Sequence, residues 1–220
     1  TTKETDIDIA IDLDGGAVDC DTGIPFFDHM LDQLGRHGGF DLTVKAEGDI
    51  HIDAHHTVED TAIVLGEAFG EALGDKAGVR RFASITVPLD EAAVEVVLDL
   101  SGRPFLVYEV EIPGEIIFSD PPFDPQLMEE FWRAVVTAAG ITLHVVSVRG
   151  RNTHHLIEAS VKGVARALRS AVAVDDGFAI REGGPGVADG AIVVYTGALF
   201  VQDPVNSGDR FSMNAPMPST

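Results

Sequence analysis

The sequence predicts an α+β protein built from two similar halves, and three observations lead to this expectation. Short alternating segments typical of half-buried strands are interleaved with segments that repeat apolar residues at helical spacing. A block of the form HHxxE occupies residues 55–59 and returns at residues 154–158, about 100 residues later. Each copy opens an expected helix. Duplication of a unit of about 90 residues explains the repeat, and because this spacing is too long for a solenoid, we expect two halves around a shared core.

The first half begins with a strand and carries two expected helices. Aspartate alternates with isoleucine or leucine over residues 6–14, which predicts a half-buried antiparallel strand. Apolar residues then recur at helical spacing over residues 26–35 and predict a short helix that carries His29. Residues 42–46 alternate as a second strand, and residues 57–73 predict a longer amphipathic helix.

The second half repeats this patterning and has more expected strands. In order, we expect strands at 80–87, 93–100 and 106–112, a helix at 126–139, a strand at 141–148 and a helix at about 155–172. The resulting organisation is a first half-repeat at 1–85 and a second at 86–175, which together form one compact domain. An atypical C-terminal extension follows at 176–220, where the apolar run 191–201 predicts one or two strands or an extended arm.

Composition excludes several classes of function. The chain has 220 residues, with 15 Lys and Arg against 36 Asp and Glu, and the net charge of −21 opposes binding to nucleic acid or to anionic membranes. Cys20 is the single cysteine, so an internal disulfide framework is excluded. Neither a membrane-spanning run nor a signal peptide is expected, which makes a cytoplasmic protein the default.

The HHxxE blocks predict metal binding. On a helix, residues i and i+4 share a face, so His55 and Glu59 can hold one ion while His56 points elsewhere, and the second block repeats this logic. Imidazole and carboxylate donors without thiolates suit Mn, Fe or Zn and exclude a structural zinc site of the Cys-rich kind. A single HH pair is usually a solvated helix start, but two matched blocks favour metal ligation.

The roles of other candidate residues have two interpretations, one structural and one functional. His29 lies in an apolar segment and, by itself, is more typical of a core histidine than of a ligand. Arg80, Arg81 and Arg103 are either surface charges or, beside a metal cluster on an acidic protein, anchors for a phosphate group.

Four segments together resemble one enzyme family. Residues 23–31 (GIPFFDHML), 54–60 (AHHTVED), 101–104 (SGRP) and 150–159 (GRNTHHLIEA) are similar to imidazoleglycerol-phosphate dehydratase of histidine biosynthesis, and the similarity runs over about residues 3–175. The resemblance implies a hydro-lyase that converts D-erythro-imidazole-glycerol phosphate to imidazole acetol phosphate through a metal-stabilised imidazolate. It also implies two Mn²⁺ ions per active site.

The resemblance further implies an architecture and an assembly. Each half is expected to be a four-stranded sheet with helices packed on one face. The chain is expected to form a homo-oligomer of 24 subunits whose sites lie between subunits and take a small phosphorylated imidazole.

The resemblance also implies roles for individual residues. The implied metal ligands are His29, His55, His56, Glu59, His154, His155 and Glu158. The implied substrate-binding residues are Gln33, His37, Arg81 and Arg103, with Lys162 a further candidate near the phosphate. Glu4 is expected to move protons, and Glu59 and Glu158 join it as expected catalytic carboxylates.

Three departures from the family pattern bear on activity. Glu130 stands where the family places a histidine equivalent to His29, so it either ligates the metal through oxygen or faces solvent. Ala54 replaces a common aspartate. The chain ends at Pro218-Ser219-Thr220 without the usual Lys-Gly. Either the extension returns Ser219 to the site, or phosphate binding depends on Arg81, Arg103 and Lys162.

These departures keep two alternative functions open. One is a catalytically impaired homologue in which the metals only hold subunits together. The other is a di-metal hydrolase of a small phosphate ester.

Overall fold

The computed structural model describes residues 1–114 and 116–174 of the chain. Over these residues the elements are β1 (Thr5–Asp12), β2 (Val18–Asp21), α1 (Pro25–Gly38), β3 (Asp41–Gly48), α2 (His55–Leu73), β4 (Phe82–Leu89), β5 (Ala92–Asp99), β6 (Phe105–Glu109), α3 (Leu127–Ala139), β7 (Thr142–Arg149) and α4 (Thr153–Val172). The expected extension at 176–220, including the apolar run 191–201 and Ser219, lies outside the described residues.

The strands form two sheets that share one pattern of pairing. The first sheet has the order β1-β3-β2, with β1 antiparallel and β2 parallel to β3. The second has the order β4-β5-β7-β6, with β5 antiparallel and β6 parallel to β7. The elements β1, β2, α1, β3 and α2 therefore correspond in order to β5, β6, α3, β7 and α4, and the expected duplication is present in the fold.

The first sheet differs from the expectation of four strands per half. It contains three strands within the described residues, because β4 pairs along its whole length with β5 and belongs to the second sheet. The expected boundary between residues 85 and 86 therefore falls inside β4. The short strand β2 was not expected, since four residues are too few to reveal an alternating pattern.

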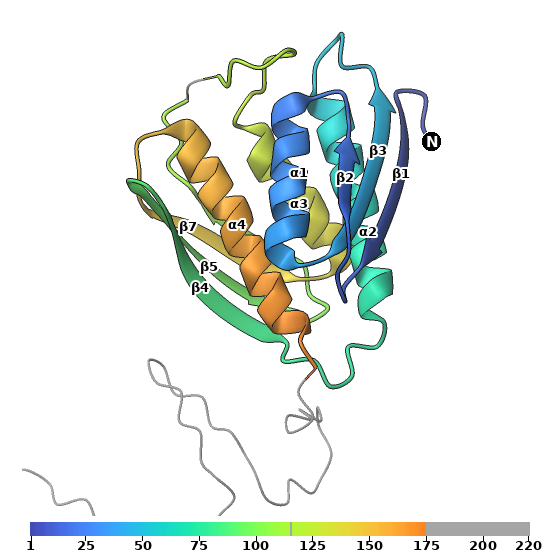
Figure 1. The fold of residues 1–220 in the computed structure, drawn as a ribbon, viewed down its shortest axis with the longest axis vertical. Helices are drawn as coiled ribbons and strands as arrows, with labels where there is room; N and C mark the ends of the chain where they lie inside the picture. Colours follow the sequence, from blue (N-terminus) through green and yellow to red (C-terminus); the bar gives the residue numbers. More distant parts are fainter. Residues whose placement is uncertain (115, 175–220) are drawn as a thin grey trace, which may run out of the picture. The chain divides into compact units, whose positions relative to one another are not determined.

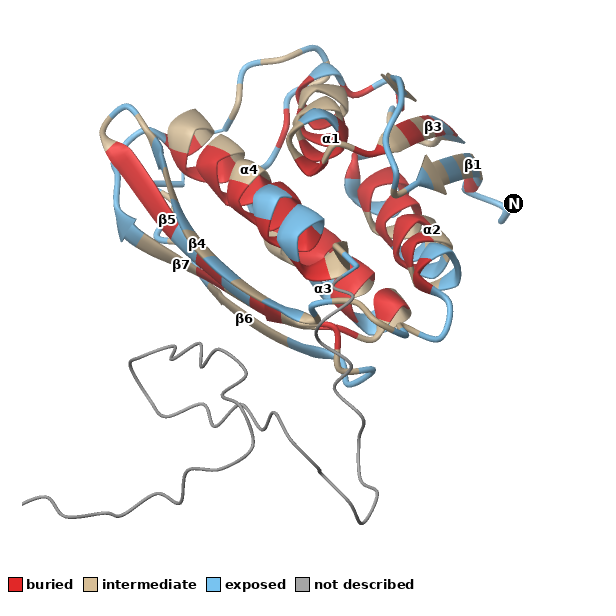
Figure 2. Ribbon diagram, turned by 60° about the horizontal axis from the view of Figure 1, so that its bottom comes forward, coloured by how far each residue is buried: buried red, intermediate tan, exposed pale blue. Residues whose placement is uncertain are grey.

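The four helices lie between the two sheets, as Figures 1 and 2 show. The helix α4 packs against β4 and β5, and α2 packs against β1 and β3. The helices also pair across the repeat, α1 with α4 and α2 with α3, so each pair contains one helix from each half. Because α1 and α4 both begin at the same end of the molecule, residues near their N-termini come together (Figure 1).

Local sequence explains why α1 forms and where it ends. Its buried residues Phe27, Met30, Leu31 and Leu34 recur at intervals of three or four, so one face of the helix enters the core. Proline occupies the first turn, where no backbone N–H is needed, and Gly39 ends the helix in the left-handed conformation with φ of 64°.

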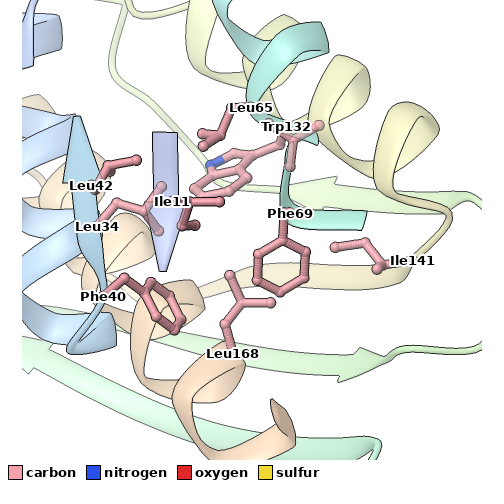
Figure 3. A pocket seen from close by; sticks show the side chains of 10 residues that line it. Ile11, Leu34, Phe40, Leu42, Leu65, Phe69, Trp132, Ile141 and Leu168 are labelled. Atoms are coloured by element: carbon pink, nitrogen blue, oxygen red, sulfur yellow. The ribbon is translucent and has the colours of Figure 1, made fainter. Parts of the chain in front are cut away.

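A small apolar cavity lies at the centre of the helix layer. Its volume is about 20 Å³, and side chains from all four helices line it, among them Leu34, Phe69, Trp132 and Leu168 (Figure 3). The halves therefore share one core, as the repeat predicted. No helix within the described residues is both long and apolar enough to cross a membrane.

Candidate metal centre

His29, His154 and Glu158 converge where α1 and α4 begin. One donor atom from each lies within 4.8 Å of the other two, and no other group of His, Cys, Asp and Glu side chains in the described residues meets this criterion. Nε2 of His154 lies 2.9 Å and Nε2 of His29 lies 3.6 Å from Oε2 of Glu158. The cluster therefore joins a ligand from the first half to two from the second.

The sequence of α4 places its two donors on one face. His154 and Glu158 are separated by four residues, which is just over one turn of helix. The side chain of Asn152 caps the helix by accepting a hydrogen bond from the backbone N–H of His155, at 3.2 Å. This cap stabilises the first turn of α4.

Lys162 forms an ion pair with the other carboxylate oxygen of Glu158. Its Nζ lies 2.7 Å from Oε1, while Oε2 faces the two histidines. Burial by itself would raise the pKa of Glu158, but the Lys162 ammonium and the His154 ring outweigh burial and hold this pKa below its usual value. The carboxylate therefore stays ionised at neutral pH, with one oxygen available to a cation.

The donor set of this cluster fits a divalent first-row metal. Two imidazole nitrogens and one carboxylate oxygen converge, no thiolate is nearby, and the carboxylate is ionised. Three donors from one chain leave further coordination positions for other ligands.

The first HHxxE block repeats the pairing but not the cluster. Nε2 of His55 lies 3.6 Å from Oε2 of Glu59, at the start of α2. The residue that corresponds to His29 is Glu130, because His29 lies ten residues before Gly39 and Glu130 lies ten before Gly140, and both glycines end their helices in the left-handed conformation. Oε2 of Glu130 lies 3.7 Å from Nε of Arg133.

The second histidine of each block points elsewhere. The paired rings, His55 with His56 and His154 with His155, lie at 83° and 82° to each other, so the two blocks share one geometry. Nδ1 of His56 lies 3.2 Å from both oxygens of Asp49, and Nδ1 of His155 lies 2.7 Å from Oε2 of Glu91. The bond to His155 lowers the pKa of Glu91 to about 2.

Three of the expected substrate-binding residues lie along the helix pair below the cluster. Gln33 and His37 follow His29 at intervals of four residues on α1, and Lys162 follows Glu158 on α4. Burial first, and then the charges of Lys162 and Arg166, hold the pKa of His37 below its ordinary value. His37 is therefore a neutral imidazole at pH 7, next to two cations.

Arg81 and Arg103 lie at the opposite end of the molecule. The backbone N–H of Arg81 donates to the carbonyl of Ala171, near the end of α4, and its Nε donates to Asp99 at 2.7 Å. Arg103 is exposed in the loop that follows β5. A helix rises 1.5 Å per residue, so this end lies about 25 Å from His154. Within one chain the arginines and the metal cluster are not brought together.

Glu4 lies immediately before β1 and is exposed. Its charge contributes to raising the pKa of His56, although the hydrogen bond that the His56 ring donates to Asp49 is the larger cause. Glu4 therefore lies near the first HHxxE block and not at the three-residue cluster. Sequence reasoning missed Asp49 and Glu91, since they come from a loop and a hairpin outside both blocks.

Comparison with known proteins identifies the family. The family model described as imidazoleglycerol-phosphate dehydratase matches residues 22–168. The chain belongs to this family. An imidazoleglycerol-phosphate dehydratase from Parafrankia sp. (strain EAN1pec) is 57% identical over 176 residues, which cover 79% of this chain and 88% of the relative. The protein of that name from Ruegeria sp. (strain TM1040) is 53% identical over 176 residues, covering 80% of this chain and 89% of the relative.

Solved structures of the family share the fold. The Staphylococcus aureus imidazoleglycerol-phosphate dehydratase superposes with a TM-score of 0.71 at 38% identity, covering 77% of this chain and 94% of that one. The Pyrococcus furiosus enzyme, solved in complex with (S)-C348, gives 0.70 at 34% identity, with 80% and 93% covered. The α+β fold expected from the sequence is therefore confirmed.

Proposed function

We propose that this chain catalyses the Mn²⁺-dependent dehydration of D-erythro-imidazole-glycerol phosphate to imidazole acetol phosphate in L-histidine biosynthesis. The observation that carries the proposal is the cluster of His29, His154 and Glu158, which joins one donor from the first half to two from the second. Family membership supports the reaction, because the relatives carry the name of this dehydratase.

The chain offers donors for two metal ions per active site. His29, His154 and Glu158 hold one ion, and His55 with Glu59 are the corresponding donors of the other half. Glu130 lies at the position that corresponds to His29 and adds a carboxylate there. When bound, the two Mn²⁺ ions supply Lewis-acid stabilisation of the imidazolate form of the substrate ring.

The chain's own residues hold the substrate and move its protons. Lys162 lies beside the cluster, where its ammonium attracts the phosphate, and Gln33 and His37 offer hydrogen bonds along the same helix pair. Loss of water requires removal of a weakly acidic proton from carbon, so a positioned carboxylate is needed as the base. Glu4 serves this role because the described residues form no hydrogen bond or ion pair with its carboxylate.

The active site is completed by other copies of the chain. Arg81 and Arg103 lie about 25 Å from the cluster of their own chain, beyond the reach of one small substrate. His56 and His155 are not part of that cluster, and carboxylates of their own chain hold Nδ1 of both rings, so Nε2 of these rings is the donor supplied to neighbouring subunits. We therefore propose a homo-oligomer, with 24 subunits as in the family pattern, in which Arg81 and Arg103 bind the phosphate of a neighbour's substrate.

Turnover tests the proposal directly. Purified protein is supplied with imidazole glycerol phosphate and Mn²⁺, and imidazole acetol phosphate is measured before and after chelation. We expect product with Mn²⁺, none after chelation, and recovery when Mn²⁺ is returned. Release of inorganic phosphate without dehydration would instead identify a hydrolase. Metal-dependent assembly without any turnover would identify an impaired homologue.

Two substitutions separate metal binding from substrate binding. Glu158→Gln removes the ionised donor, so we expect Mn²⁺ content and turnover to fall together. Arg103→Ala leaves the cluster intact, so we expect a higher KM with unchanged metal content. Glu67→Gln, at an exposed position further along α2, is the matched control and changes neither quantity. Unchanged metal content in Glu158→Gln would refute the ligand assignment.

A further inference from the structure

The second histidine of each HHxxE block is held by a carboxylate from outside the block. Both rings use Nδ1 for this contact, His155 toward Glu91 and His56 toward Asp49. In a neutral imidazole one nitrogen carries the proton and the other has the lone pair. A carboxylate at Nδ1 favours the proton there, so Nε2 is the nitrogen presented to a metal. In His155 this Nε2 lies 3.8 Å from Oδ2 of the exposed Asp90.

Glu91 is itself held rigidly. Its Oε1 accepts hydrogen bonds from the backbone N–H groups of Asn152, at 2.9 Å, and Arg151, at 3.4 Å. Its Oε2 lies 2.7 Å from Nδ1 of the His155 ring. The backbone N–H of His155 donates to the Asn152 side chain. The histidine is therefore fixed at its backbone and at its ring, and one carboxylate connects the β4–β5 hairpin to the start of α4.

The repeat gives Glu91 an equivalent in the first half. Ile11 pairs with Leu42 and Leu98 pairs with Leu143, and these partners each lie three residues after a helix-ending glycine. Counting back seven residues from Ile11 and from Leu98 gives Glu4 and Glu91. The two glutamates thus stand at the same place in the two halves, immediately before β1 and β5.

The two equivalent glutamates have different surroundings. Asp49, from the loop after β3, holds His56 in the first half, and no described residue bonds the Glu4 carboxylate. In the second half, residues 150–152 between β7 and α4 are Gly, Arg and Asn and offer no carboxylate, and the contact to His155 comes from Glu91.

We infer that Glu91 and Asp49 are positioning residues for metal ligation, which hold Nδ1 of His155 and of His56 and so present Nε2 to a metal, and that of the two equivalent glutamates Glu4 has no histidine to hold among the described residues. This inference rests on the proposed metal-dependent function. It predicts that alanine at the two equivalent positions has different effects: Glu91→Ala weakens Mn²⁺ binding, and Glu4→Ala abolishes turnover.

The test compares Mn²⁺ binding in the two variants of the whole protein. Mn²⁺ affinity is measured by EPR titration of free ion, which needs no turnover. We expect Glu91→Ala and Asp49→Ala to weaken Mn²⁺ binding about 10- to 100-fold, because residues that orient metal ligands have effects of this size. Glu4→Ala is expected to keep wild-type Mn²⁺ affinity and to lose turnover.

A control variant separates positioning from loop stability. Asn152→Ala loosens the start of α4 but leaves the contact between Glu91 and His155, so it should retain most of the Mn²⁺ affinity. Formate added to Glu91→Ala supplies a carboxylate at the vacated position and should restore part of the affinity. Glu91→Gln is expected to bind poorly, because the amide can present an N–H to Nδ1 and so favour the tautomer with the proton on Nε2.

Each outcome decides the inference. Wild-type Mn²⁺ affinity in Glu91→Ala, or an equal loss in Asn152→Ala without formate rescue, would overturn it. The wild type and all variants could fail to dehydrate the substrate while Glu91→Ala still loses Mn²⁺ affinity. In that case the proposed function fails and the positioning role stands. If Glu4→Ala loses Mn²⁺ affinity as well, the division between the two glutamates is wrong.

Discussion

At the scale of single residues, surroundings decide what equivalent side chains can do. The Glu158 carboxylate contacts Lys162 and two histidines, and its pKa is lowered. The equivalent helix of the first half has no such lysine contact at Glu59 among the described residues, and Glu130 contacts Arg133. The HHxxE pattern predicted ligands, and the structure places His154 and Glu158 together as the spacing required. The carboxylates that hold His56 and His155 could not be predicted, since Asp49 and Glu91 are brought to these rings by loops and strand pairing.

Cys20 gives a prediction about pH. Burial, followed by the nearby charges of Asp28, Asp32 and Asp19, raises the pKa of its thiol from 9.0 to about 12. The unfolded thiol therefore ionises first as pH rises. Stability from the neutral, half-buried thiol is complete below pH 9 and is lost as pH rises toward 12. Urea unfolding at pH 8 and pH 10.5 should show an alkaline loss of stability that Cys20→Ala lacks.

Alkylation of Cys20 gives an independent readout. At pH 9 the folded thiol should react with iodoacetamide slower than the unfolded thiol by a factor on the order of several hundred, because far less thiolate is present. Equal rates in the folded and unfolded protein would show that burial does not suppress ionisation of this thiol.

At the scale of elements, the helix contacts across the repeat are close. The helices α2 and α3 approach at Gly66, where an added Cβ would lie 2.7 Å from Cβ of Ala138 and 2.8 Å from the carbonyl oxygen of Val135. An added Cβ at Gly70, four residues later on α2, would have its nearest neighbour, Cα of Ala139, at 3.9 Å. These two glycines therefore make a matched pair on one helix.

Substitution of the two glycines should act in opposite directions. Gly66→Ala forces the helices apart and should lower the free energy of unfolding by about 1–3 kcal/mol. Gly70→Ala makes an ordinary van der Waals contact with Ala139 and should raise the free energy of unfolding by roughly 0.5–1 kcal/mol, because alanine favours the helix. Chemical denaturation of both variants measures this difference. Equal effects of the two changes would mean that α2 and α3 do not meet at Gly66.

The correspondence between α1 and α3 predicts the effect of changing Glu130. Glu130→His places an imidazole at the position of α3 that corresponds to His29 of α1. We expect a changed Mn²⁺ affinity and higher turnover, because a carboxylate neutralises more of the metal's positive charge than a neutral ring does, and the charge that remains acts on the substrate. The measurements are Mn²⁺ titration and kcat. Unchanged values for both would place Glu130 away from the metal and toward solvent.

Periodicity predicted the long elements well and the short ones poorly. Alternation of aspartate and isoleucine identified β1, and apolar spacing identified all four helices, although both HHxxE helices begin earlier than expected. The strand β2 is four residues long and is held in place by pairing with β3. Its position depends on a partner distant in sequence, so its own residues carry little signal.

At the scale of the whole molecule, the two outer sheet faces differ in chemistry. On the first sheet, β1 presents Asp6, Asp8 and Asp12 to solvent. On the second, the exposed side chains include Phe82, Val97 and Phe105, with 53%, 42% and 60% of their surface accessible. The charge of −21 is therefore unevenly distributed, and the second face is the one suited to contact with another copy of the chain.

Mixing two inactive variants tests whether sites span subunits. Glu158→Gln lacks a proposed metal ligand and Arg103→Ala lacks a proposed phosphate contact, so each variant should be inactive alone at low substrate concentration. If the two residues come from different chains, co-assembly of equal amounts should restore about a quarter of wild-type activity, since random mixing leaves that share of sites intact. No recovery in mixed oligomers would place both residues in the same chain's site.

Under the proposed function, the cluster of His29, His154 and Glu158 would link metal occupancy to folding. One ligand comes from the first half and two from the second, so an ion held there ties α1 to α4 and is lost when they separate. An ion bound only by the folded chain stabilises it by about 2.7 kcal/mol when its concentration is 100 times its dissociation constant. Manganese supply to the cell would then govern how long the protein persists as well as how fast it works.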